Sequence, residues 1–309
     1  MENKTLLLSI CIPTYNRAIY LEEALRNITM DQAFGEEVEI IISDNASTDE
    51  TQHIAKKYTE KYNNIHYYKN EENIRDRNFI LALLRGNGRY VRLFNDTLRL
   101  KAGALGKMLE EIRNSKENTP LFFYQNIDFL NTNVNQNKKI SGISSFISNT
   151  SYWVTWIANF GNWREIVEKI PFPNECAPLL FTQVDWSFKI VETYKEVRIY
   201  YGDYFEAVVP NKKGGYNLFE VFVNNYLSIV RKYLSGGFIL QREKYRLFRY
   251  FCCQWISLLY IKKNTYAFEK DNIWRILLKE YRWYPYFYIG IVVIWLKYKL
   301  KCIKLLGNC

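Results

Sequence analysis

Three polar segments in the first hundred residues each follow an apolar run, and their side chains are suited to ligand binding. The segments are PTYNR at residues 13–17, DNASTD at 44–49 and NDT at 95–97. Ligands of open parallel sheets bind beyond the carboxyl ends of the strands. Taken singly, each segment is typical of an ordinary turn or helix cap. Together on one sheet edge, the three segments favour a binding crevice.

The elements that must position these segments alternate between strand-like and helical patterns, which indicates a parallel α/β sheet. We expect strands at residues 6–12, 38–43, 66–69 and 90–94, and helices at 17–29, 76–84 and 103–113, with another helix opening at 47–50. The apolar stretch at residues 6–12 is interpreted as a buried strand rather than a signal peptide.

Beyond about residue 116 the pattern is less regular. It predicts a polar loop at 131–139, a helix at 182–192 and two strands within 197–209 that are broken at 202–203. Residues 212–217 are predicted to form a basic, glycine-rich loop that opens a helix, and the chain is expected to be helical from there to its end.

Composition narrows the class of function. The 309 residues carry a net charge of +10, which favours anionic partners such as nucleic acid, acidic lipid or phosphorylated small molecules. The six cysteines form no C-x-x-C pair, and only His53 and His66 are present, so neither a zinc site nor a histidine base is expected. No G-x-G-x-x-G follows the first strand, and no P-loop motif occurs.

Three blocks in this order resemble glycosyltransferase family 2. They are SICIPTYNRAIYLEEAL from residue 9, VEIIISDNASTDET from residue 38 and NIRDRNFILALLRGNGRYVRLFNDT from residue 73. The resemblance covers about the first 115 residues and extends more weakly to about residue 220. It implies an α/β, GT-A fold with a Rossmann-like, mostly parallel central sheet flanked by helices. It also implies inverting sugar transfer from a nucleotide-sugar, by default a UDP-sugar. We expect a catalytic domain at 1–215 and a mainly α-helical C-terminal region at 216–309.

The resemblance also assigns donor-binding roles to individual residues. It places Pro13, Thr14, Tyr15 and Arg17 in the first nucleotide-binding loop, Asp44 at the base, Asn45, Ser47 and Asp49 in the rest of that second loop, Arg77 and Asn78 facing the nucleotide, and Asp96 as the first acid of the metal motif. The chemistry suits these roles, because a carboxylate accepts hydrogen bonds from a base and an arginine pairs with phosphate.

The metal motif departs from the family pattern. The second acid, usually the direct metal ligand, is replaced by Leu98, so a site for Mg²⁺ or Mn²⁺ that relies on Asp96 is in doubt. Cationic side chains would then neutralise the leaving diphosphate, with Arg99, Lys101, Lys212 and Lys213 as candidates. We expect weak or absent metal dependence. Arg75 also stands where the family often has glycine.

The resemblance places the catalytic base in the second half of the chain, near the start of a helix. Asp185, in QVDW at 183–186, matches that position and would take the proton from the acceptor hydroxyl. The alternative interpretation of Asp185 is a first-turn acid that is favoured by the helix dipole. Asp128, Glu175 and Asp203 are rival bases.

The C-terminal region combines aromatic residues with basic ones. The apolar run at 286–296 is too short to span a membrane and is followed by Lys297, Lys299, Lys301 and Lys304, which suits an interfacial helix on anionic lipid. A helix packed on its own domain is the equally weighted alternative. A lipid-linked saccharide acceptor, and a cytoplasmic location at the inner face of a bacterial membrane in surface polysaccharide assembly (capsule or lipopolysaccharide), are expected on this basis.

Three other functions stay open at this stage. A nucleotidyltransferase would need a glycine-rich first loop, which PTYNRAIY lacks. A nucleic-acid-binding module fits the charge, but the carboxylates in the three polar segments would repel phosphate. A family member that binds a donor without turning it over is kept open by the missing metal ligand.

Overall fold

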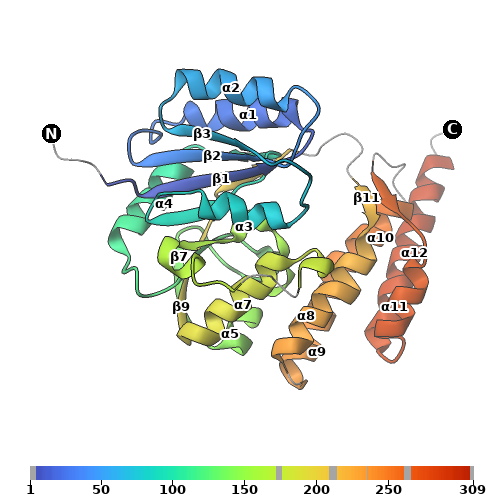
Figure 1. Ribbon diagram of the computed structural model, residues 1–309. Coiled ribbons are helices and arrows are strands. Elements are labelled where there is room, and N and C mark those ends of the chain that lie inside the picture. The colour runs from blue at the N-terminus through green and yellow to red at the C-terminus, as the bar shows by residue number, and fades with distance from the viewer. Residues whose placement is uncertain (1–4, 172–175, 209–213, 235, 261–265, 307–309) are drawn as a thin grey trace. The chain divides into compact units, whose positions relative to one another are not determined.

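The computed structural model describes residues 5–171, 176–208, 214–234, 236–260 and 266–306 (Figure 1). The chain forms two compact units. The first comprises Met1–Phe146 and Trp153–Val209, and the second comprises Ile147–Tyr152 and Pro210–Cys309. The main division therefore falls six residues before the expected boundary at 215, and a short segment from the middle of the chain belongs to the second unit.

The first unit is built on a five-stranded sheet in the order β3-β2-β1-β4-β8. Its first four strands are parallel and β8 is antiparallel to β4, as the sequence predicts for the parallel part. The strands are β1 (Leu8–Thr14), β2 (Val38–Asp44), β3 (Ile65–Lys69), β4 (Tyr90–Leu93) and β8 (Gly161–Trp163). β2 is buried along its whole length, because a parallel sheet is covered on both faces.

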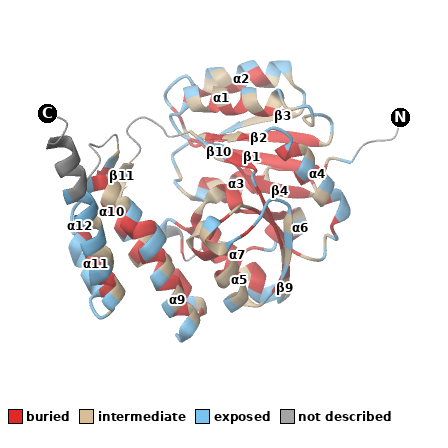
Figure 2. Ribbon diagram, turned by 180° about the vertical axis from the view of Figure 1, so that it is seen from behind, coloured by how far each residue is buried: buried red, intermediate tan, exposed pale blue. Residues whose placement is uncertain are grey.

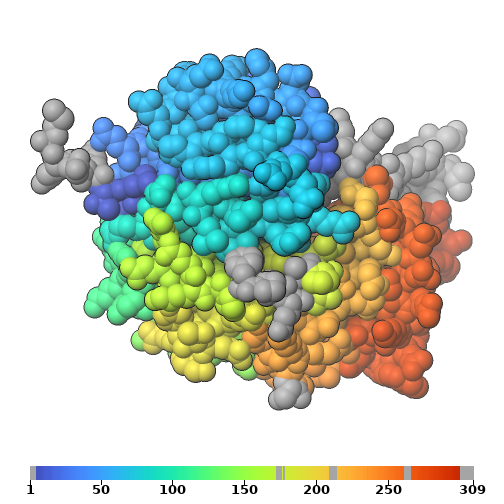
Figure 3. All heavy atoms as spheres, viewed as in Figure 1, coloured from blue at the N-terminus to red at the C-terminus, as the bar shows by residue number. Residues whose placement is uncertain are grey.

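Helices cover both faces of this sheet. α1 (Ala18–Thr29) and α2 (Thr51–Lys61) lie on one face, and α3 (Arg77–Leu84) lies on the other (Figure 1). α1 buries Leu21, Leu25 and Ile28, whose spacing places them on one side of the helix. In the space-filling view the N-terminal part of the unit, coloured blue to cyan, forms one continuous surface (Figure 3).

Two smaller sheets complete the first unit. β5 (Leu98–Leu100) pairs with β10 (Phe205–Ala207), and β6 (Leu121–Gln125), β9 (Glu196–Gly202) and β7 (Gln136–Ser141) form the other. The predicted break at 202–203 is confirmed. The predicted loop at 131–139 is wrong over 136–139, because this polar stretch is an edge strand that is hydrogen-bonded to β9. The remaining helices are α4 (Ala104–Asn114), α5 (Ile143–Thr150), α6 (Arg164–Val167) and α7 (Thr182–Tyr194).

The second unit is mainly helical, as expected. Its helices are α8 (Tyr226–Tyr233), α9 (Phe238–Arg246), α10 (Cys253–Tyr260), α11 (Ile273–Tyr281) and α12 (Pro285–Leu306), with π-helical turns at Glu220–Asn225 and Leu247–Cys252. Much of the described surface of α11 and α12 is exposed (Figure 2). Among the described residues, no helix has both the length and the apolar character needed to span a bilayer.

The predicted loop at 212–217 is wrong in its described part. β11 (Gly214–Asn217) pairs in parallel with β12 (Ala267–Glu269). At Gly214 a Cβ atom would lie 2.1 Å from the carbonyl carbon of Ala267, so only glycine allows the two backbones to approach this closely.

The segment Ile147–Tyr152 is held by residues of α9 and of the turn that follows it. Arg242 donates to Ser148 Oγ, and Arg246 Nη1 donates to the carbonyl oxygen of Ser148 at 2.9 Å. Ser151 Oγ donates to Glu243 Oε1 at 2.8 Å. The ring of Tyr152 packs edge-on to Phe251, 5.6 Å between centroids. The second unit is therefore assembled from two separate stretches of chain.

Candidate functional site

The three polar segments lie at one edge of the central sheet. β2, β1 and β4 are adjacent and parallel, and Thr14 is paired with Asp44 in the register of β1 and β2. The chain continues from β4 through Phe94, whose N–H donates to the carbonyl oxygen of Cys11, and then reaches Asp96. The carboxyl ends of all three strands therefore face the same side, which is where ligands of such sheets bind.

The loop between β1 and α1 is hydrogen-bonded to both of the other segments. Thr14 Oγ1 donates to Asp96 Oδ2 at 2.9 Å, which ties the loop to the end of β4. Asn16 N donates to Ser47 Oγ at 2.9 Å, and Ala18 N donates to Asp49 Oδ2 at 3.1 Å, which ties it to the loop after β2. The three segments form one connected cluster of side chains.

Asp96 is a buried carboxylate with a half-exposed cation beside it. Arg17 Nη1 lies 3.0 Å from Asp96 Oδ1, and the Arg17 side chain is 47% exposed, whereas that of Asp96 is 2% exposed. Burial raises the pKa of Asp96, and the guanidinium of Arg17 and the hydroxyl of Thr14 act in the opposite direction. Arg17 keeps guanidinium surface in solvent, where it can meet an anion such as a phosphate.

Asp44 is fully buried at the end of β2, and both of its oxygens accept hydrogen bonds. Ser47 N donates to Oδ1 at 2.8 Å, and Tyr67 OH donates to Oδ2 at 2.8 Å. Burial and the Asp44 carboxylate raise the pKa of Tyr67 above its usual value. The carboxylate predicted to meet the base thus fixes the loop after β2 against β3.

Asp49 connects the starts of two helices. Besides Ala18 N, it accepts hydrogen bonds from the backbone N–H and the hydroxyl of Thr51, the first residue of α2. Burial acts to raise the pKa of Asp49, but these hydrogen bonds outweigh it and lower the pKa below the usual value. The carboxylate therefore stays ionised and satisfies orphan N–H groups at the start of α1 and α2.

Asn45 and Asn78 belong to an amide network beneath the loop after β2. Asn45 Nδ2 donates to Asn73 Oδ1 at 2.8 Å. Asn78 is buried, donates to the carbonyl oxygen of Ser43 at 2.8 Å, and accepts from Ser43 Oγ at 2.6 Å and from Asn70 Nδ2 at 2.9 Å. The side-chain amide of Asn78 therefore hydrogen-bonds to residues that support the loop.

Three consecutive charged residues, Arg75, Asp76 and Arg77, lie at the start of α3. Arg75 has a left-handed backbone with φ of 52°, which explains why glycine suits this position. Burial raises the pKa of Asp76, the N-cap of α3, to about 6, and Arg75 acts in the opposite direction. Arg77 is exposed at the first helical residue.

Pro13 and Thr14 end β1, and Tyr15 is exposed just beyond it.

Asp185 lies in the first turn of α7 and is fully buried. Lys189 Nζ lies 2.9 Å from Asp185 Oδ2, one helical turn away. Trp186 is buried and its ring packs on Phe160, 5.3 Å between centroids, so it does not offer a free face to a sugar.

The rival acids occupy other surroundings. Asp203 pairs with Lys101 at 2.6 Å, and Lys101 holds the pKa of Asp203 below its usual range. Asp128 is exposed in a short 3-10 turn. Glu175 lies outside the described residues.

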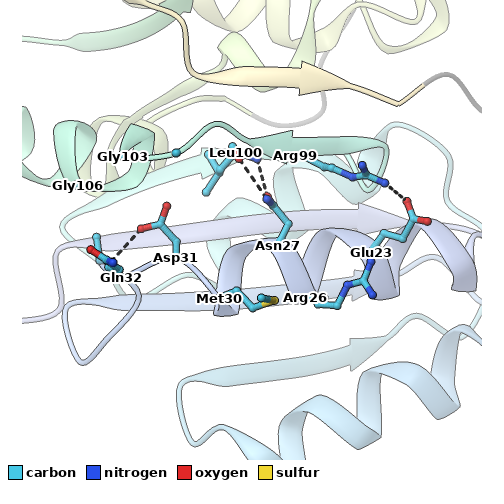
Figure 4. A pocket seen from close by; sticks show the side chains of 12 residues that line it. Glu23, Arg26, Asn27, Met30, Asp31, Gln32, Arg99, Leu100, Gly103 and Gly106 are labelled. Carbon is cyan, nitrogen blue, oxygen red and sulfur yellow. Dashed lines mark hydrogen bonds and ion pairs between the residues drawn. The ribbon is translucent and has the colours of Figure 1, made fainter.

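Arg99 lines a cavity of the first unit that is separate from the polar cluster, since Asp44, Asp49 and Asp96 do not line it. This cavity, of about 830 Å³, is bounded by α1, β5 and the start of α4 (Figure 4). Arg99 reaches Glu23 of α1 at 2.7 Å, so its charge is matched by that carboxylate. Lys212 and Lys213, the other cations predicted to meet the diphosphate, lie outside the described residues.

In the described part of the chain, the protein donors around Asp96 are too few to hold a divalent cation without oxygens from a ligand. Each oxygen of the carboxylate already accepts a hydrogen bond, one of them from a guanidinium. Leu98, at the position of the usual second acid, is buried in β5. Among the described residues, no group of three or more His, Cys, Asp or Glu side chains is placed to hold a metal.

Several residues of this site were missed in the sequence. Tyr67, Asn70 and Arg85 support the loop after β2, with Arg85 Nη1 donating to Ser43 Oγ at 2.6 Å and Arg85 Nη2 to Asn70 Oδ1 at 2.9 Å. Their contacts depend on the register between β2 and β3, which no local pattern reveals. Asn70 directly after a strand, and Asn73 three residues later, are the signal that could have indicated this network.

Comparison with known proteins places the chain among sugar-transferring enzymes. The model of the family described as glycosyl transferase family 2 matches residues 9–187. Abequosyltransferase RfbV of Salmonella typhimurium is 45% identical over 91 residues, which are 29% of this chain and 27% of that protein. The GalNAc(5)-diNAcBac-PP-undecaprenol beta-1,3-glucosyltransferase of Campylobacter jejuni is 30% identical over 106 residues, 34% of each. The matches span about a third or less of these relatives.

Solved structures share the fold. The Staphylococcus aureus TarS fragment 1–349 in complex with UDP-GlcNAc has a TM-score of 0.59 at 19% identity, over 83% of this chain and 76% of that one. The mannosyltransferase PcManGT from Pyrobaculum calidifontis, in complex with GDP-Man and Mn²⁺, has a TM-score of 0.53 at 15% identity, over 80% of this chain and 71% of that one. At such identities the likeness concerns the fold, and the expected GT-A architecture is confirmed.

Proposed function

Because the chain belongs to glycosyl transferase family 2, we propose that it transfers a sugar from a nucleotide-sugar to a saccharide hydroxyl with inversion. The observation that carries this proposal is the cluster around residues 14–18, which joins Asp49 and Asp96 through direct hydrogen bonds and Asp44 through Ser47. A nucleotide laid across the three strand ends would meet this cluster on one side.

The donor we propose is a UDP-sugar, bound by the residues of the three loops. Arg17 would pair with the diphosphate, since its guanidinium is half-exposed beside Asp96. Asn45, Ser47 and Asp49 would shape the pocket, and Asp44 would meet the base. A related fold that holds UDP-GlcNAc supports the choice of uridine.

Asp185 is our proposed base. Its carboxylate would take the proton of the acceptor hydroxyl as that oxygen attacks the anomeric carbon, while the bond from that carbon to the diphosphate oxygen breaks. The ion pair with Lys189, one helical turn away, would hold the carboxylate in position until the acceptor arrives. Arg17 and Arg77 would neutralise the leaving diphosphate, with weak or no dependence on metal.

The acceptor we propose is a lipid-linked saccharide used in bacterial surface polysaccharide synthesis, reached from the inner face of the membrane. The Campylobacter relative is named for an undecaprenol-diphosphate-linked acceptor. Residues 210–309 contain 18 Lys and Arg but 5 Asp and Glu, so they suit an anionic lipid surface.

The test has two steps. A thermal-shift screen of UDP, GDP and other nucleotides should single out uridine, because a ligand at a hundredfold excess over its Kd stabilises the fold by about 2.7 kcal/mol. Asp185→Asn should keep this shift and lose transfer about 100-fold or more, the usual contribution of a general base. Both assays are run in excess chelator, and we expect sugar transfer by the wild type to persist under this condition.

Asp203→Asn is the matched control, because it removes another acid of the first unit that is held by a lysine. It should leave transfer within about twofold of wild type. Transfer retained in Asp185→Asn would place the base elsewhere, and the absence of any nucleotide shift would contradict the proposed function.

A further inference from the structure

An apolar groove of about 310 Å³ lies between three helices of the second unit. It is lined by Ile256 and Tyr260 of α10, Trp274 of α11, and Ile291, Ile294 and Trp295 of α12. Its volume is at the lower end of the range for ligand pockets, about 300–1,000 Å³. Tyr260, Trp274 and Trp295 are each exposed by between 42% and 54%, so the groove opens to the surface along an aromatic rim.

The outer side of α12 is also apolar and exposed. Tyr288, Ile289, Val292 and Leu296 do not line the groove, and each is exposed by between 47% and 63%. Monomeric soluble proteins rarely expose contiguous apolar surface on this scale unless it contacts a partner or a membrane. Tryptophan and tyrosine beside aliphatic residues are typical of the membrane–water interface.

The charges next to the groove favour an anionic occupant. α12 contains four lysines and no acidic residue. Lys299 Nζ lies 5.6 Å from the ring centroid of Trp295, which lines the groove, so at least one of these cations stands at its edge. The acid Glu280 of α11 already pairs with Lys244 at 2.8 Å and with Arg231. A second copy of this chain would bring like charges together, whereas an anionic lipid would not.

We propose that this groove holds part of the hydrocarbon chain of a polyprenyl-diphosphate acceptor, with Lys297 and Lys299 of α12 beside its diphosphate. The proposal rests on the proposed function for the identity of the lipid. Burial of the chain against Trp274, Ile294 and Trp295 would supply the apolar contribution, and the lysines would supply the electrostatic one. The acceptor would then be selected by its lipid as well as by its sugar.

The test uses the full-length protein and substitutes tryptophans inside and outside the groove. Trp274→Ala combined with Trp295→Ala removes two walls of the groove that are already partly exposed, so folding should survive. Trp283→Ala is the control, since Trp283 is 80% exposed and does not line the groove. Circular dichroism and sedimentation velocity verify the fold and the oligomeric state of each variant.

The first readout does not depend on sugar transfer. Farnesyl diphosphate, titrated against the protein, should bind to wild type and to Trp283→Ala, and the double variant should bind at least tenfold more weakly. Inorganic diphosphate should not reproduce the binding. No binding to wild type, equal loss in Trp283→Ala, or a change of oligomeric state in the double variant would overturn the proposal.

The second readout compares one acceptor saccharide on a long polyprenyl chain and on a ten-carbon chain. Wild type should prefer the long chain at least tenfold in kcat/KM, and the double variant should lose this preference while its rate on the short chain is unchanged. An equal preference in both proteins would contradict the groove. Farnesyl diphosphate binding without transfer to either acceptor would support the groove and contradict the proposed function.

Discussion

Arg17 and Asp96 form an ion pair whose two members differ in burial. The carboxylate is buried and the guanidinium is half-exposed, so the pair lies across the boundary between core and solvent. Asp96 therefore depends on Arg17 for its charge balance, while Arg17 has guanidinium surface left for a ligand.

Replacing Arg17 by alanine should lower the free energy of unfolding by about 1–2 kcal/mol, less than the 3–5 kcal/mol for a fully buried pair because Arg17 is partly solvated. It should also weaken UDP binding about tenfold or more. Adding Asp96→Asn should restore most of the stability without restoring UDP binding. Urea unfolding and titration calorimetry measure the two effects. A double variant as unstable as the single one would show that Asp96 does not need the cation.

At the residue scale, the sequence predicts which acids gather but not what they contact. Asp44, Asp49 and Asp96 were singled out because each follows an apolar run, and the structure places them in one cluster. The hydrogen bonds of Asp49 at the starts of two helices, and the hydrogen bond from Tyr67 to Asp44, depend on how distant segments pack together. The roles of these residues toward a donor stay predictions.

At the element scale, the apolar runs of the parallel sheet were readable because a strand buried on both faces has few alternatives. β7 was missed because its residues are polar and its edge position lets them stay solvated. β11 and β12 were missed because both are short and neither is continuously apolar. Each strand forms only by pairing with the other, some fifty residues away in the sequence. Local patterns cannot supply that partner.

Glu243 is a buried acid that connects several elements of the second unit and should make their stability depend on pH. It connects α9 to α8 through Tyr226 OH at 2.9 Å, and to the segment Ile147–Tyr152 through Ser151. Burial raises the pKa of Glu243 to about 7, although Ser151, Tyr226, Arg246 and Arg242 act in the opposite direction. Between about pH 4.5 and 7 the folded protein keeps a proton that the unfolded chain releases.

The free energy of unfolding should therefore fall as the pH rises through this window, by about 3 kcal/mol at most. Glu243→Gln should be less sensitive by that amount, because an amide does not titrate. Urea unfolding between pH 5 and 8 measures the slope, with Glu220→Gln, an exposed acid of the same unit, as control. An unchanged slope in Glu243→Gln would assign the pH dependence to other groups.

At the scale of the whole molecule, charge is divided unevenly along the chain. Residues 210–309 carry a net +13, whereas residues 1–209 carry 24 Lys and Arg against 27 Asp and Glu, a net of −3. The excess of positive charge therefore falls within residues 210–309, the part for which we propose contact with anionic lipid. This division is readable from the sequence, but the membership of residues 147–152 in the second unit is not, because it depends on contacts with α9.

The protein should bind vesicles that contain phosphatidylglycerol and not vesicles of phosphatidylcholine alone, with binding that weakens as salt rises. Lys297→Gln with Lys299→Gln should weaken binding about tenfold or more, since each cation near such a surface contributes about 1 kcal/mol. Lys56→Gln with Lys61→Gln, on α2, is the control. Vesicle flotation measures the effect, and equal loss in both double variants would contradict a specific role for α12.

The two-piece make-up of the second unit has a consequence for modular exchange. Removing everything after residue 209 would leave Ser148, Ser151 and Tyr152 without the groups that contact them, among them Glu243 and Arg246. Swapping the tail for that of another enzyme would create the same mismatch unless the insert at 147–152 moved with it. Recombination between related genes at a single crossover should therefore yield poorly folded hybrids, and the two stretches should be inherited together.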